Sequence, residues 1–428
     1  MNSTIEQLAV KLKADSTVAK FQLSQSTNRT VSGGFLNNAV GGVYRPIQVS
    51  DSSGLSYRVE FIDGQASNGS MPASTEIEQI VQVIRQGKHK PVEPIEIAPK
   101  LDEVPDPRLL DKELAAQINN EPDFVSKAVT TLQSNHNFEE IENTEGEIEA
   151  MYGASRIINS NGVDITSEGT KYSSYVSLND RIGYTESTRR SQDPKVMQNY
   201  SNHYTEIALA LDKKPALASS GSYPVLFSSS TGWSILGAYL RSNLTGFNLD
   251  AGQSRFTLDD LTSHKQISHE DFSLSYNQIV DMDPYSFKFD GEGIPAQKFD
   301  LIKNGKLVEP ICDLKSAHKL GYAPRSLGGL KTNLVQTTEY DDFKKKNPTF
   351  LLVFGLLGLH SVNNVTGDFS LPSDNILLIQ DGNIVGPVNG VFSGNFFDTL
   401  MRPSTGFVNA AHLFDSPALT FETQITVK

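Results

Sequence analysis

Between Lys88 and Arg108 the chain carries five prolines, at positions 91, 94, 99, 105 and 107. Proline has no backbone N–H and its ring clashes with the preceding helical turn, so no helix can continue through this segment. We therefore interpret residues 91–110 as a linker. With 428 residues, the chain has enough material for two or three packed domains around it.

The segment before the linker contains two patterns that are typical of amphipathic helices. Residues 4–13 have apolar side chains at helical spacing, and residues 73–88 show the same spacing. For the second helix, Ser74 is the predicted N-cap and Gly87 the predicted terminator. The apolar faces consist of Ile5, Leu8, Ala9 and Leu12 in the first helix, and of Ile77, Ile80, Val81 and Ile84 in the second.

Two strands are expected between these helices. Residues 19–27 and 55–65 are rich in strand-forming side chains, and the second stretch ends at the turn signal Asp63-Gly64. Residues 1–90 are thus predicted to form an N-terminal α+β domain.

After the linker, residues 111–215 are predicted to form a middle segment that packs with the N-terminal domain. A helix pair is followed by residues 154–180, which alternate like two strands broken by a turn at Asn161-Gly162. Residues 194–212 then have an apolar stripe at helical spacing.

Residues 216–428 are predicted to form a β-rich C-terminal domain. Residues 220–246 begin as a short strand and continue as a helix, and from residue 255 onward short strands and turns dominate. The longest apolar run, residues 350–359, is about half of the roughly 20 residues that a membrane span needs.

The composition narrows the classes of function. The net charge is −13, and the densest basic run is Lys344-Lys345-Lys346, which disfavours direct binding to nucleic acid. Cys312 is the single cysteine, which fits a reducing compartment, and we interpret it as a small buried hydrophobe. The first 20 residues lack the apolar core of a signal peptide. We expect a cytoplasmic protein that does not bind membranes.

The histidines do not form a zinc-peptidase motif. His269 is followed by Glu270, but no histidine lies three to five residues further on. His264 lies five residues before His269, about 140° around a helix, so the two imidazoles cannot share an ion on one helix face. Exposed or capping histidines are the better interpretation.

Asp290 and Glu292 lie in the sequence DGEGIPA, residues 290–296. The glycines are similar to a dinucleotide-binding pattern, but Pro295 stands where the helix of that motif would begin, so we reject this interpretation. The two acidic residues are either paired carboxylates or part of a tight turn, and a turn is the commoner explanation.

A second candidate stretch is GLHSVNNVTGDFSL, residues 358–371, which follows the longest apolar run. His360 and Asp368 could carry chemistry, but a histidine after a buried strand is more often hydrogen-bonded in a turn. We interpret Ser361 and Asn363 as loop residues as well, and a role of this loop in lining a groove stays open. The residues alone define no complete active site.

The C-terminal half resembles the TldD/PmbA family, whose members are cytosolic proteins known as modulators of DNA gyrase or microcin-processing proteases. Three segments in order carry the resemblance: residues 220–236 with YPVLF, residues 275–321 with FDGEGIPA, and residues 358–400, which begin with the loop just described. The resemblance extends over residues 150–428. It implies an α+β protein with an α/β-sandwich-like N-terminal domain and a C-terminal β-rich domain that is similar to a barrel or sandwich.

In this family the TldD kind resembles a zinc peptidase, with H-E-x-x-x-H on the helix after the YPVLF-like strand and a cysteine near the C-terminus. Here residues 230–246 contain no histidine and no glutamate, and residues 406–428 contain no cysteine; His412 alone does not make the site. The chain therefore resembles the metal-free PmbA (TldE) kind. We expect no cofactor in this chain, and zinc only in a partner.

The resemblance implies a subunit that pairs with a TldD-type zinc peptidase and helps to form a cavity for extended peptides. Two alternatives remain. The first is a self-sufficient hydrolase that uses His360, Asp368, Asp290 or Glu292 in an uncharted site. The second is a homodimeric regulatory protein that acts on DNA gyrase.

Overall fold

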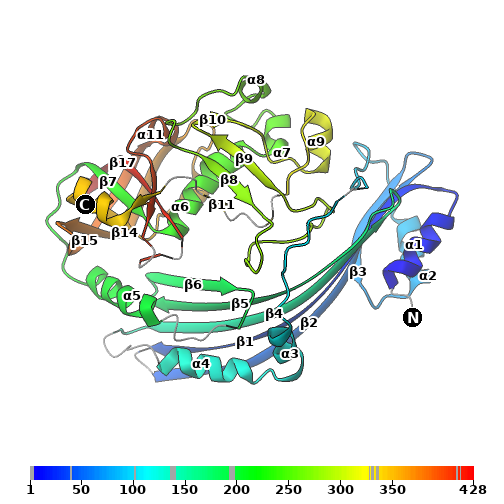
Figure 1. Cartoon of the computed structure of the whole chain (residues 1–428), viewed down its shortest axis with the longest axis horizontal. Coiled ribbons are helices and arrows are strands. Elements are labelled where there is room, and N and C mark those ends of the chain that lie inside the picture. The colour runs from blue at the N-terminus through cyan, green and yellow to red at the C-terminus, as the bar shows by residue number, and fades with distance from the viewer. Residues whose placement is uncertain are drawn as a thin grey trace.

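The computed structural model describes residues 4–38, 41–100, 103–134, 141–191, 198–326, 328, 332–333, 337–410, 413–414 and 416–428. A long curved sheet runs the length of the molecule, and a β-rich domain lies on its concave side (Figure 1). The protein is thus an α+β protein, as the sequence predicted.

The curved sheet has six strands in the order β3-β2-β1-β4-β5-β6, and all neighbouring strands are antiparallel. Strands from both sides of the proline-rich segment therefore share one sheet. Their bounds are β1 Val18–Asn38, β2 Gly41–Phe61, β3 Ala66–Pro72, β4 Thr144–Asn159, β5 Asp164–Leu178 and β6 Ile182–Thr188.

The first two strands are much longer than the sequence predicted. Each has 21 residues and continues through polar stretches that carry no hydrophobic alternation. These stretches are strands because β1 lies in the middle of the sheet, where β2 and β4 take up its backbone hydrogen bonds on both sides. Side-chain patterning reports burial, not backbone pairing, so it missed them.

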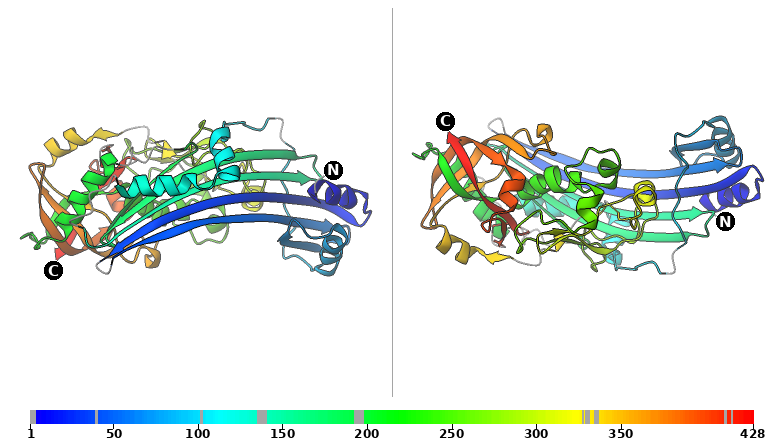
Figure 2. Two further views of the ribbon diagram at one scale, coloured as in Figure 1. Left: turned by 90° about the horizontal axis from the view of Figure 1, so that it is seen from below. Right: turned by 90° about the horizontal axis from the view of Figure 1, so that it is seen from above.

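Four helices cover the outside of this sheet. The helices α3 (Lys112–Asn120) and α4 (Phe124–Ser134) pack below it, while α1 (Thr4–Ala14) and α2 (Ile77–Gln86) lie together at the far end (Figures 1 and 2). The predicted apolar face of α1 is confirmed, since all four of its members are buried.

The predicted N-cap of α2 is wrong. The helix begins at Ile77, its N-cap is Glu76, and no side chain caps it. Ser74 lies in the turn that follows β3, where the Thr75 amide donates to the Pro72 carbonyl. The predicted terminator, Gly87, is confirmed as the C-cap.

The C-terminal domain is built around a closed β-barrel. Strand β17 pairs with both β15 and β7, which closes the order β17-β15-β14-β13-β7 into a ring, and β16 and β12 extend it. The strands are β7 Gly221–Phe227, β12 Thr338–Glu339, β13 Thr349–Val353, β14 Asp368–Gln380, β15 Asn383–Asn395, β16 Gly406–Asn409 and β17 Ala418–Val427. The barrel that the resemblance implied is therefore confirmed.

Shorter elements complete this half of the chain. A small sheet has the order β10-β9-β8-β11 and lies beside the barrel. Its strands are β8 Leu274–Asn277, β9 Lys298–Lys303, β10 Lys306–Leu307 and β11 Thr332–Asn333; the helices are α5 Gln198–Leu211, α6 Ser229–Leu236, α7 Gly246–Asp250, α8 Leu258–Thr262, α9 Leu314–Leu320, α10 Tyr340–Lys346 and α11 Phe396–Leu400.

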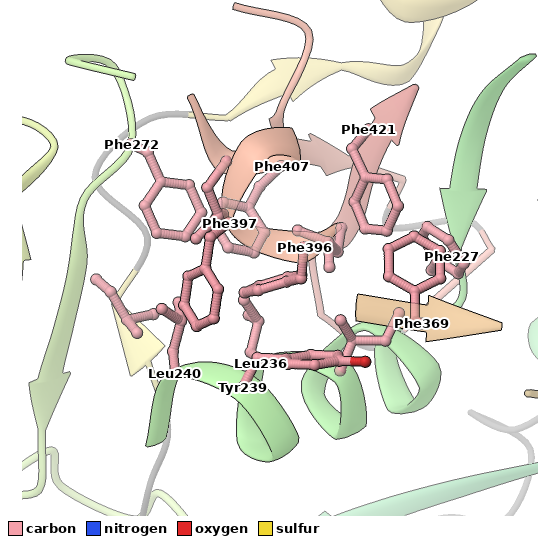
Figure 3. Packing of buried hydrophobic residues seen from close by; sticks show 14 of the residues in the cluster. Phe227, Leu236, Tyr239, Leu240, Phe272, Phe369, Phe396, Phe397, Phe407 and Phe421 are labelled. Atoms are coloured by element: carbon pink, nitrogen blue, oxygen red, sulfur yellow. The ribbon is translucent and has the colours of Figure 1, made fainter. Parts of the chain in front are cut away.

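Aromatic side chains fill the core between α6 and the barrel (Figure 3). Tyr239 stacks on Phe396 with ring centroids 4.7 Å apart, and Phe227 meets Phe421 at the same separation. The apolar run of β13 is explained by burial on both faces: Leu351 belongs to this core, whereas Leu352 belongs to the core that reaches the curved sheet. Among the described helices, none is both long and apolar enough to cross a membrane.

The proline-rich segment is not a free tether. Its described residues contain no helix, as predicted, but Ala98 is fully buried against the curved sheet. Its amide donates to Gln22 Oε1, and its carbonyl accepts from Asn159 Nδ2 over 2.8 Å. The predicted boundaries of the domains at residues 90, 110 and 215 stay a prediction.

Candidate functional site

The candidate site is a surface groove of about 650 Å³ on α6 and the π-helical turn Gly237–Arg241 that continues it. One wall is formed by residues of this helix and turn. The other wall is the loop after β13, which contains a short 3₁₀ turn, Leu359–Ser361. The lining residues are Trp233, Ser234, Gly237, Ala238 and Arg241 from the helix, and Leu359, His360, Val362 and Asn364 from the loop.

Helical spacing explains which side chains of the helix reach the groove. Leu236, Tyr239 and Leu240 point into the core above the helix (Figure 3). Gly237 and Arg241 lie on the opposite side, one helical turn apart. The helix α6 lies on the concave side of the curved sheet (Figure 1). Single π-helical turns within α-helices are frequent at functional sites.

Asn243 fastens the two walls together. Its side chain is fully buried, and its Nδ2 donates to the carbonyls of Tyr239 and Asn364 over 2.7 and 2.8 Å. Its Oδ1 accepts from the Arg255 amide. The Asn364 side chain donates in turn to Ser242 Oγ. The groove wall is therefore held by hydrogen bonds on both sides of the loop.

Arg255 and Asn395 hold the rest of this loop. The Arg255 guanidinium donates to the carbonyls of Val365 and Thr366 and lies 4.3 Å from the centroid of the Phe397 ring. Asn395 Nδ2 donates to the Thr366 carbonyl and to Asp368 Oδ1, each over 2.8 Å. These contacts fix the end of the loop to the rest of the C-terminal domain.

Of the four candidates in this loop, only His360 lines the groove. Ser361 Oγ donates to the Gly358 carbonyl, and Asn363 Oδ1 accepts from the amides of Val365 and Thr366, which makes both of them turn residues. The Asp368 carboxylate faces Asn395, whose hydrogen bond, with that of Thr366, lowers the pKa of the carboxyl. Their involvement in chemistry stays a prediction.

The structure places Asp290 and Glu292 elsewhere, where the C-terminal domain meets the curved sheet. Asp290 Oδ1 accepts from the amides of Glu292 and Ile294, so the stretch is a tight turn, the interpretation that the sequence favoured. Glu292 pairs with Arg58 of β2 over 2.8 Å and accepts from the Leu314 amide. The Glu292 carboxylate therefore joins the C-terminal domain to the curved sheet, the Asp290 carboxylate stabilises its own turn, and neither lines the groove.

The other candidates do not form a site among the described residues. Cys312 is fully buried, and burial raises the pKa of its thiol to about 11, as expected for a structural cysteine. His264 Nδ1 lies 2.8 Å from the Leu307 carbonyl, and His269 Nδ1 lies 3.4 Å from an Asp271 carboxylate oxygen. His412 lies outside the described residues.

Comparison with known proteins identifies a family domain in the part of the chain that contains the groove. Residues 220–414 match the PmbA/TldA metallopeptidase C-terminal domain. This part of the chain belongs to the PmbA/TldD family. The matched range contains the barrel strand β7, the helix α6 and both walls of the groove. The resemblance noted in the sequence is therefore confirmed.

Two curated relatives are distant ones. An uncharacterized protein of Methanocaldococcus jannaschii is 28% identical over 269 residues, which are 59% of this chain and 62% of that protein. The metalloprotease PmbA of Escherichia coli O157:H7 is 28% identical over 188 residues, or 43% of this chain and 40% of the relative. The matches thus span less than two thirds of the length of these relatives.

Solved structures share this fold over nearly the whole chain. A protein described as a modulator of DNA gyrase from Bacteroides thetaiotaomicron superposes with a TM-score of 0.81 at 20% identity, covering 99% of this chain and 98% of that one. TldE from Thermococcus kodakarensis superposes with a TM-score of 0.75 at 19% identity, covering 99% and 100%. At these identities the likeness shows the fold alone.

The groove does not fit a zinc ion. The helix that forms one wall of the groove, residues 229–243, has no histidine, cysteine or carboxylate. Within the described part of the chain, no three His, Cys, Asp or Glu side chains gather closely enough to hold a metal. His360 is the one lining residue of a type that zinc prefers, and structural or catalytic zinc sites need three or four such ligands.

Sequence reasoning missed Trp233, Arg241 and Asn243. Nothing in the sequence indicated that the loop of residues 359–364 lies opposite the helix after YPVLF. The sequence did offer one signal, because Asn243 places an amide side chain at the end of an apolar helix. This side chain is buried, and buried amides need hydrogen-bond partners.

Proposed function

We propose that this chain is a metal-free, PmbA/TldE-like subunit of a TldD-type cytosolic metallopeptidase, in which it forms part of the cavity that binds extended peptides. Under this proposal the partner chain supplies the zinc and the catalytic groups. This chain supplies a peptide-binding wall and does not cleave peptides by itself.

One observation carries the proposal: the helix after β7 faces a groove but offers no metal ligand to it. In the TldD kind, by the resemblance, this helix carries H-E-x-x-x-H. Here the same face consists of Trp233, Gly237, Ala238 and Arg241, with Ser234 at the rim. A helix face that keeps its groove and lacks the ligands suits binding better than catalysis.

The construction of the groove supports a binding role. The loop wall is fixed by the buried side chain of Asn243 and by Arg255, so the groove keeps its shape without a ligand. Preformed sites bind ligands more tightly because less conformational entropy is lost on binding. The apolar lining residues Trp233, Leu359 and Val362 rest on the aromatic core.

The test compares the chain alone with the chain mixed with a TldD-type protein from the same organism. We expect no stoichiometric zinc and no cleavage of an unfolded peptide by this chain alone, and cleavage by the mixture that exceeds the activity of the partner alone. Bound metal is measured by atomic emission, and cleavage is followed with a fluorogenic unstructured peptide.

The contrary outcomes are equally specific. Stoichiometric zinc together with cleavage by this chain alone would refute the proposal. Cleavage without zinc that is lost in His360→Ala would favour the self-sufficient hydrolase instead. A stable homodimer that co-purifies with DNA gyrase and leaves the activity of the partner unchanged would favour the regulatory alternative.

A further inference from the structure

Arg241 places a permanent positive charge in the groove. It lies at the end of the π-helical turn and is exposed, and its guanidinium folds back so that one nitrogen would lie 3.7 Å from a Cβ on Gly237. The guanidinium stays protonated in proteins and offers a planar fork of N–H donors. His360 stands on the opposite wall and is exposed as well.

Neither side chain has a partner in the described part of the molecule. No hydrogen bond or ion pair joins Arg241 or His360 to any described side chain, and no acidic residue lines the groove. Other arginines are paired: Arg85 with Asp15, and Arg325 with Glu309, each at 2.9 Å. The chain has a net charge of −13, yet no carboxylate lines this groove.

The remaining lining residues form the surface beside the positive charge of Arg241. Gly237 and Ala238 keep the groove floor open next to Arg241 because they carry little or no side chain. Trp233 is half-buried, and its ring stacks on that of Phe407 with the centroids 5.9 Å apart. It offers a fixed apolar surface one helical turn before Gly237. Leu359 and Val362 provide apolar surface on the other wall.

We propose that Arg241, assisted by His360, binds a carboxylate of an extended peptide in the groove, with a neighbouring apolar side chain of that peptide against Trp233 and Leu359. This inference rests on the proposed function and adds a substrate preference to it. A guanidinium and a carboxylate form paired charge-assisted hydrogen bonds, which are about twice as strong as neutral ones. The carboxylate is either the C-terminus of the peptide or an acidic side chain.

The test measures binding of three probes to the full-length chain by fluorescence anisotropy. Each probe is an unstructured peptide of ten residues that carries an uncharged BODIPY dye at its N-terminus and no charged group except where stated. The first ends in leucine with a free carboxylate, the second is its C-terminal amide, and the third is the amide with an aspartate before the leucine. Binding of the first or third probe about tenfold tighter than the amide is expected, the range for hydrogen bonds to a charged group.

The variants are Arg241→Gln and His360→Gln, with Arg190→Gln as the control at an exposed arginine outside the groove. We expect Arg241→Gln to remove the preference for the carboxylate and to leave binding of the amide unchanged. His360→Gln should weaken the preference, and Arg190→Gln should preserve it. Circular dichroism and the melting temperature establish that each variant is folded.

The outcomes separate this inference from the proposed function. Equal binding of all three probes overturns the carboxylate preference and leaves peptide binding supported. A preference that survives in Arg241→Gln overturns the role of Arg241. A wild-type chain that binds none of the probes also overturns the inference, while the proposed function is judged separately by cleavage with the TldD-type partner. The first and third probes show whether a terminal or a side-chain carboxylate is bound.

Discussion

Asn243 on the helix and Asn364 on the loop join the two walls of the groove through a hydrogen bond of 2.8 Å from the Asn243 amide nitrogen to the Asn364 carbonyl. The Asn243 side chain is completely inaccessible to solvent. Its remaining hydrogen bonds go to the helix itself and to the Arg255 amide, so one buried side chain serves three segments.

We expect Asn243→Ala to lower the free energy of unfolding by about 3 kcal/mol, because it leaves buried donors and acceptors without partners. Urea unfolding followed by tryptophan fluorescence measures this change, since Trp233 lies on the same helix. Asn383→Ala, at the exposed first residue of β15, is the control and should change stability by less than about 0.5 kcal/mol. A similar small loss of stability in both variants would contradict this role of Asn243.

Arg189 connects the end of the curved sheet to the C-terminal domain. Its guanidinium donates to the carbonyls of Asp283, Pro284 and Ser286 and to that of Thr170. Burial lowers the pKa of this guanidinium. We expect Arg189→Gln to destabilise the protein by about 3 kcal/mol, because several carbonyls lose a charged donor at once. The neighbouring Arg190 is exposed, so Arg190→Gln should have little effect in the same unfolding experiment.

Asp290 should make stability decrease as the pH rises. Burial raises the pKa of its carboxyl above 3.8. The folded protein therefore binds this proton more tightly than the unfolded chain, so the contribution to stability is greatest below the unfolded pKa and is lost as the pH rises through the folded pKa. Asp290→Asn keeps the acceptor for both backbone amides and removes the charge. We expect the variant to gain stability relative to wild type between pH 4 and pH 7, as measured by urea unfolding at about these two values.

Asp368 is the matched control for that experiment, because its shift has the opposite sign. Hydrogen bonds from Asn395 and Thr366 lower the pKa of its carboxyl. Its contribution is present above the unfolded pKa and is lost as the pH falls through the folded pKa. Asp368→Asn should therefore lose stability relative to wild type as the pH rises from about 2 to about 4, and the difference should stay nearly constant between about pH 4 and pH 7. The same sign of change in both variants would contradict the assignment.

Cys312 should be unreactive in the folded protein. Burial raises the pKa of its thiol to about 11, and the side chain is packed so closely that a Cβ on Gly246 would lie 2.7 Å from its sulfur. At pH 8 we expect iodoacetamide to modify the native protein at least about a hundredfold more slowly than the unfolded chain, because the thiolate is the reactive form. Mass spectrometry follows the reaction at this single cysteine. Equal rates in the two states would show that the thiol is accessible.

The local elements were predictable wherever burial is periodic. The apolar face of α1 was found because one side of the helix is buried and the other is solvated. The turn at Asn161-Gly162 was found because this residue pair is a turn signal between two alternating segments. The polar halves of β1 and β2 were not, because what makes them strands is pairing with β4, which is distant in the sequence. Ser74 failed as a cap for a related reason: the backbone turn after β3, not the side chain, sets where α2 begins.

Part of the candidate site was also beyond local reasoning. His360 was singled out from its own loop, but Arg241 and Asn243 acquire their roles only when that loop folds onto α6. Asp290 and Glu292 looked like paired carboxylates in the sequence, and the fold uses Glu292 to bind Arg58 across the contact between the domains. Such roles depend on which surfaces meet.

The sequence alone determined the family of the C-terminal part and the absence of zinc ligands on the helix after β7, because both depend on residue type and order along the chain. It also fixed the break at the proline-rich segment, since proline cannot donate the hydrogen bonds of a helix. Only the tertiary structure decided that both sides of this break share one sheet, that the barrel closes through β17 and β7, and that Arg241 and His360 face one groove. Each of these depends on contacts between residues far apart in the sequence, whose closure entropy is compensated only by the assembled core.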